Sequence, residues 1–350
     1  MSVVSFDLTR IGWDPEFASA FSERAPAGAF PARVLAEHRG QLELQAAHGQ
    51  LRATPPPPGL ELDAPAVGDW VVVLPTPDHE VPACILEVLP RRTRFVRKTI
   101  YHHSTGQLVA ANIDTVLIVT SANLEFNDRR TERYLAVVRA GGAEPVVVLT
   151  KADLCPEPQR LLARLPCQGV AVSALYGQGL EQLEPWVGPG RSVALVGSSG
   201  VGKSTLVNAL LGTPLQDTGE IREHDAHGRH TTTTRRLLAL PGGGALIDTP
   251  GMRELGLYEA DVQGTFQDIT EHAARCRYAD CRHEGEPDCA VAEALDAGEI
   301  NAKRLKSYRK LQRELAHEKR RQVKGAKRRA AKRLKKRIRA NQKWRREHGG

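Results

Sequence analysis

The chain has 350 residues, and its 49 Lys/Arg against 41 Asp/Glu give a net charge of +8. Six cysteines in a chain of this size do not suggest a disulfide scaffold and fit a reducing compartment better. The first residues lack the pattern of a signal peptide, and no apolar stretch approaches the length of a membrane span. We therefore expect a cytoplasmic, monomeric protein of two or three domains that makes no membrane contact.

The net charge is distributed unevenly along the chain. From Lys303 to Gly350 there are 22 Lys/Arg and 3 Glu, a net charge of +19. The other 302 residues carry 27 Lys/Arg and 38 acidic residues, a net charge of −11. An acidic body with an intensely basic tail indicates a polyanionic partner, and nucleic acid fits this description best.

The first hundred residues predict a leader and a small β domain. Residues 1–29 form the leader, whose apolar residues predict a cap that packs on the next domain. Residues 30–100 hold short β-forming runs separated by turn signals, which predicts a small barrel or a sandwich, with an oligonucleotide-binding (OB-like) barrel as one candidate. The segment Arg91–Lys98 places five basic residues around Phe95. An RNA-facing edge and a solvated linker explain this segment equally well.

Residues 111–253 predict an α/β domain. Buried strands are expected at 113–120, 146–149 and 192–196, with a further strand that ends at Ser173-Ala174. Helices are expected at 130–140, 161–165 and 205–211, and two more strands come before Gly251. Alternation of strands and helices predicts a mostly parallel sheet with ligands at the carboxyl ends of its strands.

The segment GSSGVGKS fits the phosphate-binding loop pattern and lies between an expected strand and an expected helix. The glycines allow backbone N–H groups to surround phosphate oxygens at the helix N-terminus. Lys203 is expected to reach the β- and γ-phosphates, and Ser204 to bind Mg²⁺. The predicted nucleotide contacts here are Gly197, Ser198, Ser199, Gly200, Val201, Gly202, Lys203, Ser204 and Thr205.

Two further motifs predict a guanine nucleotide. The segment TKAD (Thr150, Lys151, Ala152, Asp153) resembles the guanine-reading motif Asn-Lys-x-Asp, with threonine in place of asparagine. The Asp153 carboxylate can accept hydrogen bonds from guanine N1–H and its exocyclic amine, a donor pair that adenine lacks. Ser173 and Ala174 are expected to give the last base contact, through a backbone N–H to the guanine O6.

The segment DTPG predicts the second acidic element of the site. Asp248 is expected to hold Mg²⁺ directly or through water, and the Gly251 amide to contact the γ-phosphate. In ordinary GTPases the guanine-reading motifs follow the phosphate loop, whereas here they precede it. The motif order therefore predicts a circularly permuted GTPase domain.

Residues 254–302 predict a metal-binding module, and residues 303–350 a basic helical tail. Cys276, Cys281, His283 and Cys289 offer three thiolates and one imidazole, which suit a structural, tetrahedral Zn²⁺, although iron is not excluded. The other cysteines, Cys84, Cys155 and Cys167, are expected to be packed in the fold.

These features together resemble ribosome small-subunit-dependent GTPase A, a family of bacterial permuted GTPases. The most specific parts are the permuted motif order, the segment GRHTTT (228–233) and the segment CRYADCRHEGEPDCAV (276–291). The resemblance covers residues 30–315. It implies a multi-domain fold: an N-terminal OB-like barrel, a central permuted α/β P-loop GTPase domain and a C-terminal, mostly helical zinc-binding module. It does not explain the basic tail.

The resemblance also implies a function and residues that carry it. It implies GTP hydrolysis to GDP with Mg²⁺, stimulated by the small ribosomal subunit, and a role in late maturation of that subunit through its rRNA. It assigns His230 to the attacking water, because Met252 after DTPG cannot orient one; the alternative is a solvated loop histidine. It places Thr232 at the γ-phosphate and Mg²⁺, with Thr231 and Thr233 as close rivals.

Two other functions are compatible with the sequence. The first is an RNA-binding assembly chaperone whose nucleotide site is weak or regulatory and whose barrel and tail act on the RNA. The second is an ATPase, which Thr150 in place of asparagine would permit. A Lys203→Ala substitution tests the first alternative, and competition between GTP and ATP tests the second.

Overall fold

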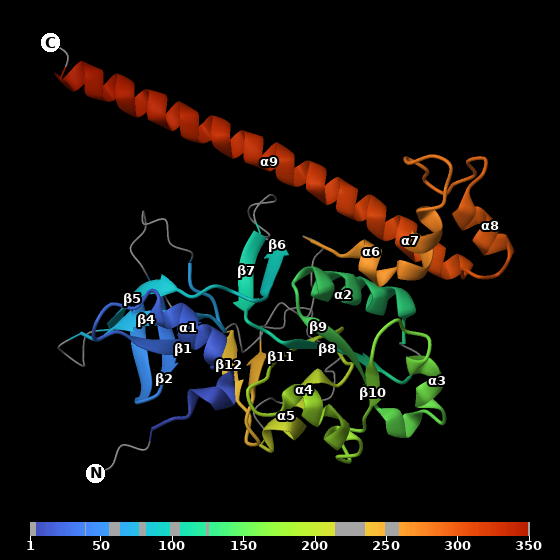
Figure 1. Ribbon diagram of the computed structural model, residues 1–350, viewed down its shortest axis with the longest axis horizontal. Coiled ribbons are helices and arrows are strands. Elements are labelled where there is room, and N and C mark those ends of the chain that lie inside the picture. The colour runs from blue at the N-terminus through green and yellow to red at the C-terminus, as the bar shows by residue number, and fades with distance from the viewer. Residues whose placement is uncertain are drawn as a thin grey trace, which may run out of the picture. The chain divides into compact units, whose positions relative to one another are not determined.

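The computed structural model describes residues 5–38, 40–55, 64–76, 82–98, 106–123, 126–213, 235–248 and 259–348 (Figure 1). The chain divides into two compact units. Unit 1 comprises Met1–Phe95 and Leu108–Leu255, and unit 2 comprises Val96–Gln107 and Gly256–Gly350. In the part of the chain that is described, no helix combines the length and the apolar character needed to cross a lipid bilayer.

The leader forms a short helical cap on the first strands of unit 1. It contains η1 (Leu8–Ile11) and α1 (Pro15–Ser22), and the Asp14 side chain caps α1 by accepting hydrogen bonds from the backbone of Glu16 and Phe17. The Trp13 ring packs edge-on against Trp70, with 4.8 Å between the ring centroids. Aromatic burial of this kind fixes the leader to the β domain.

The β domain is a closed five-stranded barrel. Its strands are β1 (Phe30–His38), β2 (Gln41–Ala46), β3 (Gly49–Thr54), β4 (Trp70–Leu74) and β5 (Ala83–Val88). They pair in the order β1-β2-β3-β5-β4, and antiparallel pairing of β4 with β1 closes the barrel. Small and branched apolar side chains such as Ala32, Val34, Leu44 and Val71 fill its interior. The structure thus confirms the barrel and excludes the sandwich.

The α/β domain has a mostly parallel sheet. Its strands are β8 (Thr115–Ser121), β9 (Glu144–Thr150), β10 (Gly169–Ala171), β11 (Ser192–Val196), β12 (Arg236–Ala239) and β13 (Ala245–Asp248). They pair in the order β10-β9-β8-β11-β13-β12, and only β12 is antiparallel to its neighbour in this set. The parallel strands therefore end at one edge, where the predicted nucleotide motifs follow them.

Helices connect these strands, as the alternating sequence pattern predicts. They are α2 (Asp128–Ala140), η2 (Ala152–Leu154), α3 (Pro158–Leu162), η3 (Leu180–Leu183), α4 (Glu184–Val187) and α5 (Lys203–Leu211). The buried side chains of α2 include Leu135 and Val138, and Asn127 caps its N-terminus. The helix after the phosphate loop begins at Lys203, two residues earlier than the sequence predicts.

The barrel and the α/β sheet are joined within unit 1. Strand β1 pairs with β12 through Ala36 and Arg236, which extends the sheet across both domains. The buried Arg33 guanidinium donates hydrogen bonds to the carbonyls of Gly68 at 3.3 Å and Asn112 at 3.0 Å, and also to that of Ile11. One side chain therefore ties together the leader, the barrel and the segment that enters β8.

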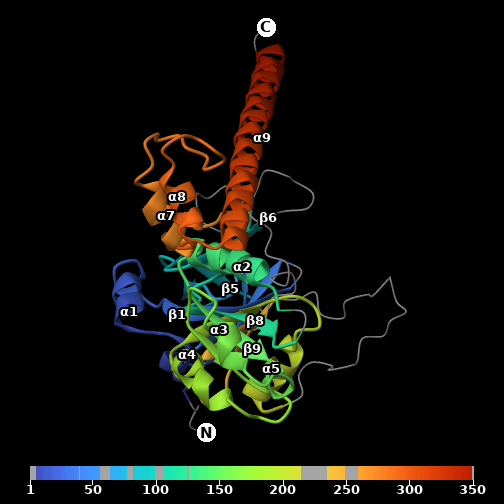
Figure 2. The ribbon, with the colours of Figure 1, turned by 90° about the vertical axis from the view of Figure 1, so that its right-hand side faces the viewer.

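Strands β6 (Arg94–Lys98) and β7 (Gly106–Ala111) form a separate two-stranded sheet, and each has residues in both units. The rest of unit 2 is mostly helical. Its helices are α6 (Val262–Thr265), α7 (Gln267–Ala273), α8 (Ala290–Asp296) and α9 (Ala302–His348). Both views show α9 as one uninterrupted helix (Figures 1 and 2). Its first turns are anchored by the Arg304 guanidinium, which contacts the Asp268 carboxylate at 2.7 Å, and by Tyr308, which packs on Phe266.

Candidate nucleotide site and metal centre

The phosphate loop follows β11 at the carboxyl edge of the sheet, and its shape requires glycine at Gly197 and Gly202. Gly197 has φ of +148°, and a Cβ there would lie 2.2 Å from the Val119 carbonyl oxygen. Gly202 has φ of +91° and immediately precedes α5. No other residue adopts these conformations without strain. The backbone of Gly197–Ser204 is therefore shaped to pass close to an anion at a helix N-terminus.

The Lys203 side chain folds back onto the phosphate loop. Its ammonium donates hydrogen bonds to the Gly197 carbonyl at 2.8 Å and to the Ser198 carbonyl. The Ser198 hydroxyl lies 2.8 Å from the guanidinium of Arg130, near the start of α2. Two cationic side chains thus converge on this end of the loop, where negatively charged phosphates would be stabilised.

Thr150 connects the guanine-reading motif to the phosphate loop. Its side chain is buried, and its hydroxyl oxygen lies 2.5 Å from the Val201 carbonyl and 3.1 Å from the Thr120 carbonyl. The Thr150 hydroxyl is therefore sufficient to connect β9 to the phosphate loop, although the Asn-Lys-x-Asp motif that TKAD resembles has an asparagine at this position. No local sequence pattern indicates this contact.

Asp153 and Ser173 come from different strand ends and meet at the predicted base site. The Ser173 hydroxyl donates a hydrogen bond of 2.5 Å to Asp153 Oδ1, which leaves Oδ2 free of this bond for a base. Ser173 also forms a backbone bridge with Gln178 that holds the loop containing Ala174. Lys151 adopts a left-handed backbone with φ of +55° and donates to the Gly200 carbonyl at 3.1 Å. TKAD, Ser173 and the phosphate loop therefore form one connected site.

The expected Mg²⁺ ligands Ser204 and Asp248 follow adjacent strands. Strands β11 and β13 are parallel neighbours; Ser204 lies at the start of α5, and Asp248 ends β13. A hydroxyl and a carboxylate are oxygen donors of the kind that Mg²⁺ prefers. His230, Thr232 and Gly251, like the rivals Thr231 and Thr233 and the neighbouring Met252, lie outside the described residues.

The four predicted zinc ligands come together in unit 2, between the end of α7 and the start of α8. Their ligand atoms all lie within 4.8 Å of one another. The Cys276 sulfur lies 3.9 Å from that of Cys289, which lies 3.7 Å from that of Cys281. His283 Nδ1 lies 3.6 Å from Cys276 Sγ and 3.5 Å from Cys289 Sγ. A tetrahedral zinc with Zn–S of about 2.3 Å and Zn–N of about 2.0 Å needs S···S edges of about 3.8 Å and S···N edges of about 3.5 Å.

The environment of His283 also suits a metal ligand. Burial lowers the pKa of His283, which favours the neutral imidazole that binds metals. Its ring lies 6.4 Å from that of Tyr308, so the first turns of α9 pack beside the ligand cluster. Four protein ligands fill a tetrahedral site, and the ion would therefore stabilise the fold rather than bind substrate.

The remaining cysteines lie outside this cluster. Burial raises the pKa of Cys167 to about 11, as expected for a packed thiol, and Cys155 is half-buried. The expectation that Cys84 is packed is wrong, because its side chain is exposed. Cys84 alternates along β5 with Ala83 and Ile85, which point into the barrel, and it therefore faces outward.

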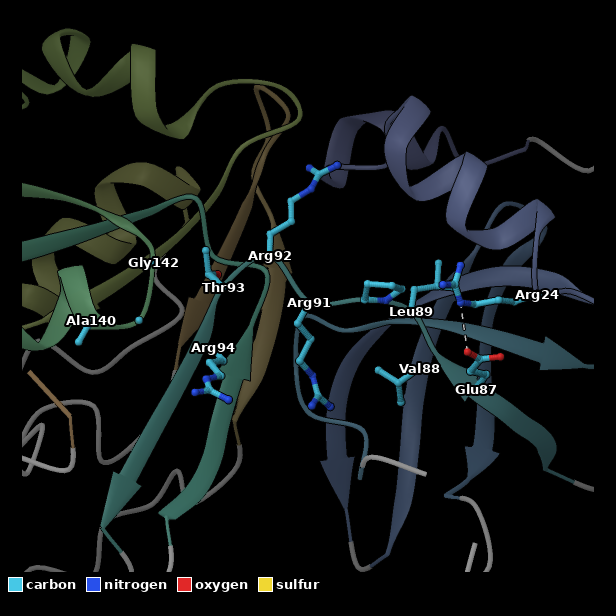
Figure 3. A pocket seen from close by; sticks show the side chains of 12 residues that line it. Arg24, Glu87, Val88, Leu89, Arg91, Arg92, Thr93, Arg94, Ala140 and Gly142 are labelled. Carbon is cyan, nitrogen blue, oxygen red and sulfur yellow. Dashed lines mark ion pairs between the residues drawn. The ribbon is translucent and has the colours of Figure 1, made fainter. Parts of the chain in front are cut away.

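A cavity of about 650 Å³ lies in unit 1, along the segment that leaves the barrel (Figure 3). Several arginines line it, but Figure 3 shows the side chains of Arg91 and Arg92 pointing to opposite sides. Arg91 binds the buried Asp69 carboxylate at 2.8 Å, and Arg92 binds the Asp14 carboxylate at 2.6 Å. Phe95 is buried. Arg91 and Arg92 are therefore both engaged in ion pairs within unit 1.

Comparisons with known proteins agree with this arrangement. The family model described as RsgA GTPase matches residues 88–258. The chain is 47% identical to the small ribosomal subunit biogenesis GTPase RsgA of Opitutus terrae, over 90% of this chain and 91% of that protein. It is also 47% identical to the protein with the same name from Streptomyces coelicolor, over 88% of this chain and 86% of that protein.

Two solved structures share the fold. The crystal structure of YjeQ from Thermotoga maritima is 27% identical, with a TM-score of 0.62 over 82% of this chain and 99% of that chain. The crystal structure of YloQ, described as a circularly permuted GTPase, is 20% identical, with a TM-score of 0.60 over 83% of this chain and 96% of that chain. The second likeness supports the fold alone.

Proposed function

Because the chain belongs to the RsgA GTPase family, we propose that its GTP hydrolysis serves late maturation of the small ribosomal subunit and is stimulated by that subunit. The observation that carries the nucleotide assignment is the hydrogen bond between Ser173 and Asp153, beside a phosphate loop that Thr150 and Lys151 hold. This bond supports the proposal that a base-reading carboxylate and a phosphate cradle form one site. We infer that the protein acts in the cytoplasm as a monomer.

We assign the chemistry to groups around the phosphates. Lys203 would turn from the loop carbonyls to the β- and γ-phosphates, and Ser204 and Asp248 would hold Mg²⁺, which neutralises charge on the phosphate oxygens. Thr232 and the Gly251 amide would contact the γ-phosphate, and His230 would orient the attacking water. These last three residues are assigned from the family resemblance.

We assign the contact with rRNA to the basic face of α9. Seven basic residues alternate at spacings of three and four with His317 among them, and all are exposed: Lys303, Lys306, Lys310, Arg313, Arg320, Lys324 and Lys327. Leu305, Tyr308 and Leu311, on the other side of the helix, are buried. Lys303 and Lys327 are 24 positions apart, which corresponds to about 36 Å along an α-helix. The basic face could therefore follow the phosphates of an RNA duplex over a substantial length.

The experiment for the proposed function is GTP hydrolysis by the full chain with and without purified small ribosomal subunits. We expect slow intrinsic turnover that rises at least tenfold with subunits, and GTP to outcompete ATP. Equal hydrolysis rates with and without subunits would contradict stimulation. Equal competition by GTP and ATP for the site would support the ATPase alternative. An intact cellular function of Lys203→Ala would favour the assembly chaperone, in which the nucleotide site is dispensable.

The RNA contact has a separate test. Removal of the residues after 319 deletes three of the seven exposed cations, Arg320, Lys324 and Lys327, together with the Lys/Arg beyond them. We expect RNA affinity to fall and the slope of log K against log salt to become shallower by about 0.7 to 0.9 for each phosphate that the shortened helix no longer reaches. An unchanged affinity and slope would show that this part of α9 does not bind RNA.

A further inference from the structure

We propose that Arg130 is a positioning residue for phosphoryl transfer, which holds the phosphate loop through the Ser198 hydroxyl. Arg130 lies near the start of α2, where the Asn127 side chain accepts a hydrogen bond from its backbone N–H at 3.2 Å. Its guanidinium Nη1 lies 2.8 Å from Ser198 Oγ. The side chain therefore reaches the loop from an element that carries none of the nucleotide motifs.

The contact completes a set of side chains that fix the loop from outside. Lys151 binds the carbonyl of Gly200, and Thr150 binds that of Val201. Arg130 holds Ser198, at the other end of the same turn. In the absence of these contacts, a glycine-rich loop has many accessible conformations, and fixing it would cost conformational entropy at each turnover.

The role of Arg130 becomes specific when phosphates bind. The Lys203 ammonium also donates a hydrogen bond to the Ser198 carbonyl. Lys203 is needed at the phosphates and must release that carbonyl when they arrive. The Arg130–Ser198 contact does not compete for the same groups and can persist. Its planar guanidinium is preorganised for such a contact.

The other end of α2 is also fixed, so Arg130 extends from a rigid element. The Gly141 carbonyl accepts a hydrogen bond of 3.1 Å from the backbone N–H of Arg94. A Cβ on Gly141 would lie 3.0 Å from the Phe95 ring, which shows how closely the two pack. The 13 residues of α2 span about 20 Å between these anchors. Arg130 thus connects the phosphate loop to the segment that leaves the barrel.

The test is a double-mutant cycle in single-turnover GTP hydrolysis by the full chain, using Arg130→Met, Ser198→Ala and the double variant. We expect each single variant to lower the single-turnover hydrolysis rate constant about tenfold, with the half-saturating concentration changed less than about threefold, because misplacement of the loop impairs the transition state more than binding. The double variant should be no slower than the singles, because both substitutions remove the same hydrogen bond.

Arg129→Met is the matched control, because Arg129 is exposed in the same turn of α2 and its replacement removes the same charge. It should retain the single-turnover hydrolysis rate constant of the wild type, and all variants should show unchanged thermal unfolding. Multiplicative losses in the double variant would overturn the proposal, since Arg130 would then act without Ser198. An equal loss in Arg129→Met would also overturn it, because the effect would be one of general charge. Ser198→Ala keeps the proposal testable if Arg130→Met does not fold.

Discussion

The Ser173 hydroxyl donates a hydrogen bond of 2.5 Å to Asp153 Oδ1, although the two residues follow different strands of the sheet. The bond fixes the orientation of the carboxylate before any base arrives. A fixed acceptor pair distinguishes guanine from bases that lack the N1–H and amine donors, because a mismatch leaves a polar group without a partner. We therefore expect base selectivity to depend on both residues together.

Replacement of Asp153 by asparagine should change the base preference. The amide loses one acceptor and gains a donor, so GTP affinity should fall about 100-fold or more. Xanthosine triphosphate, which has a carbonyl in place of the guanine amine, should bind the variant better than GTP does. Competition against a fluorescent nucleotide measures both. Glu157→Gln removes a nearby charge as a control, and a variant that still prefers GTP would contradict the assignment.

Replacement of Thr150 by valine should weaken nucleotide binding through the phosphate loop. Valine keeps the shape of the side chain but leaves the Val201 carbonyl without its 2.5 Å contact. An unsatisfied buried carbonyl costs about 1–3 kcal/mol, so we expect GTP and GDP affinity to fall about tenfold. Thr150→Ser keeps the hydroxyl and should bind as the wild type. Equal affinity of the valine and serine variants would show that the contact is dispensable.

Loss of the metal centre should unfold part of unit 2 and leave nucleotide binding intact. Cys289→Ser removes a buried candidate ligand that lies close to the other three, and we expect one equivalent of zinc to be lost by elemental analysis. The helical signal and the thermal stability should fall when the zinc is lost. GDP affinity should stay within about twofold of the wild type, because the predicted nucleotide contacts all belong to unit 1. Cys84→Ser is the control. Full zinc content in Cys289→Ser would contradict the site.

Replacement of Arg33 by methionine should destabilise unit 1. Burial lowers the pKa of Arg33 to about 10, and its guanidinium satisfies buried carbonyls from three segments. Methionine removes the donor from all three carbonyls, although that of Gly68 keeps a hydrogen bond of 3.2 Å from the Asn112 side-chain amide, and we expect the free energy of unfolding to fall by about 3 kcal/mol. Urea unfolding measures the change. Arg52→Met, at an exposed position of β3, should cost less than about 0.5 kcal/mol; similar losses in both variants would show that the buried contacts are unimportant.

The Asp14–Arg92 pair should make stability depend on acid pH. Hydrogen bonds from the Arg92 guanidinium lower the pKa of Asp14 below its ordinary value. A lowered folded-state pKa means that the unfolded chain binds the proton more readily. The stabilisation is therefore present above about pH 4 and is lost as the pH falls through the folded pKa. Asp14→Asn keeps a helix cap, so the difference in unfolding free energy from the wild type should shrink between pH 6 and pH 3. A constant difference would contradict this origin.

The local sequence determined the fold class and the motifs of the site. Strand and helix periodicity, together with glycine and lysine at fixed spacing, are constraints that act within a few residues. The barrel, the permuted α/β domain and the membership in the RsgA GTPase family are accordingly confirmed. That the four candidate metal ligands come together was also predictable, because they lie within 14 residues of one another.

The tertiary structure decided which distant side chains support the site. Thr150 contacts a residue 51 positions away, Arg130 one 68 positions away and Arg33 one 79 positions away. Each contact depends on the order of strands in the sheet, which no local pattern encodes. The same dependence turned Arg91 and Arg92 toward Asp69 and Asp14. A motif depends on the chemistry of residues that are neighbours in the sequence. The distant side chains that hold it in place depend on which strand ends the fold brings together.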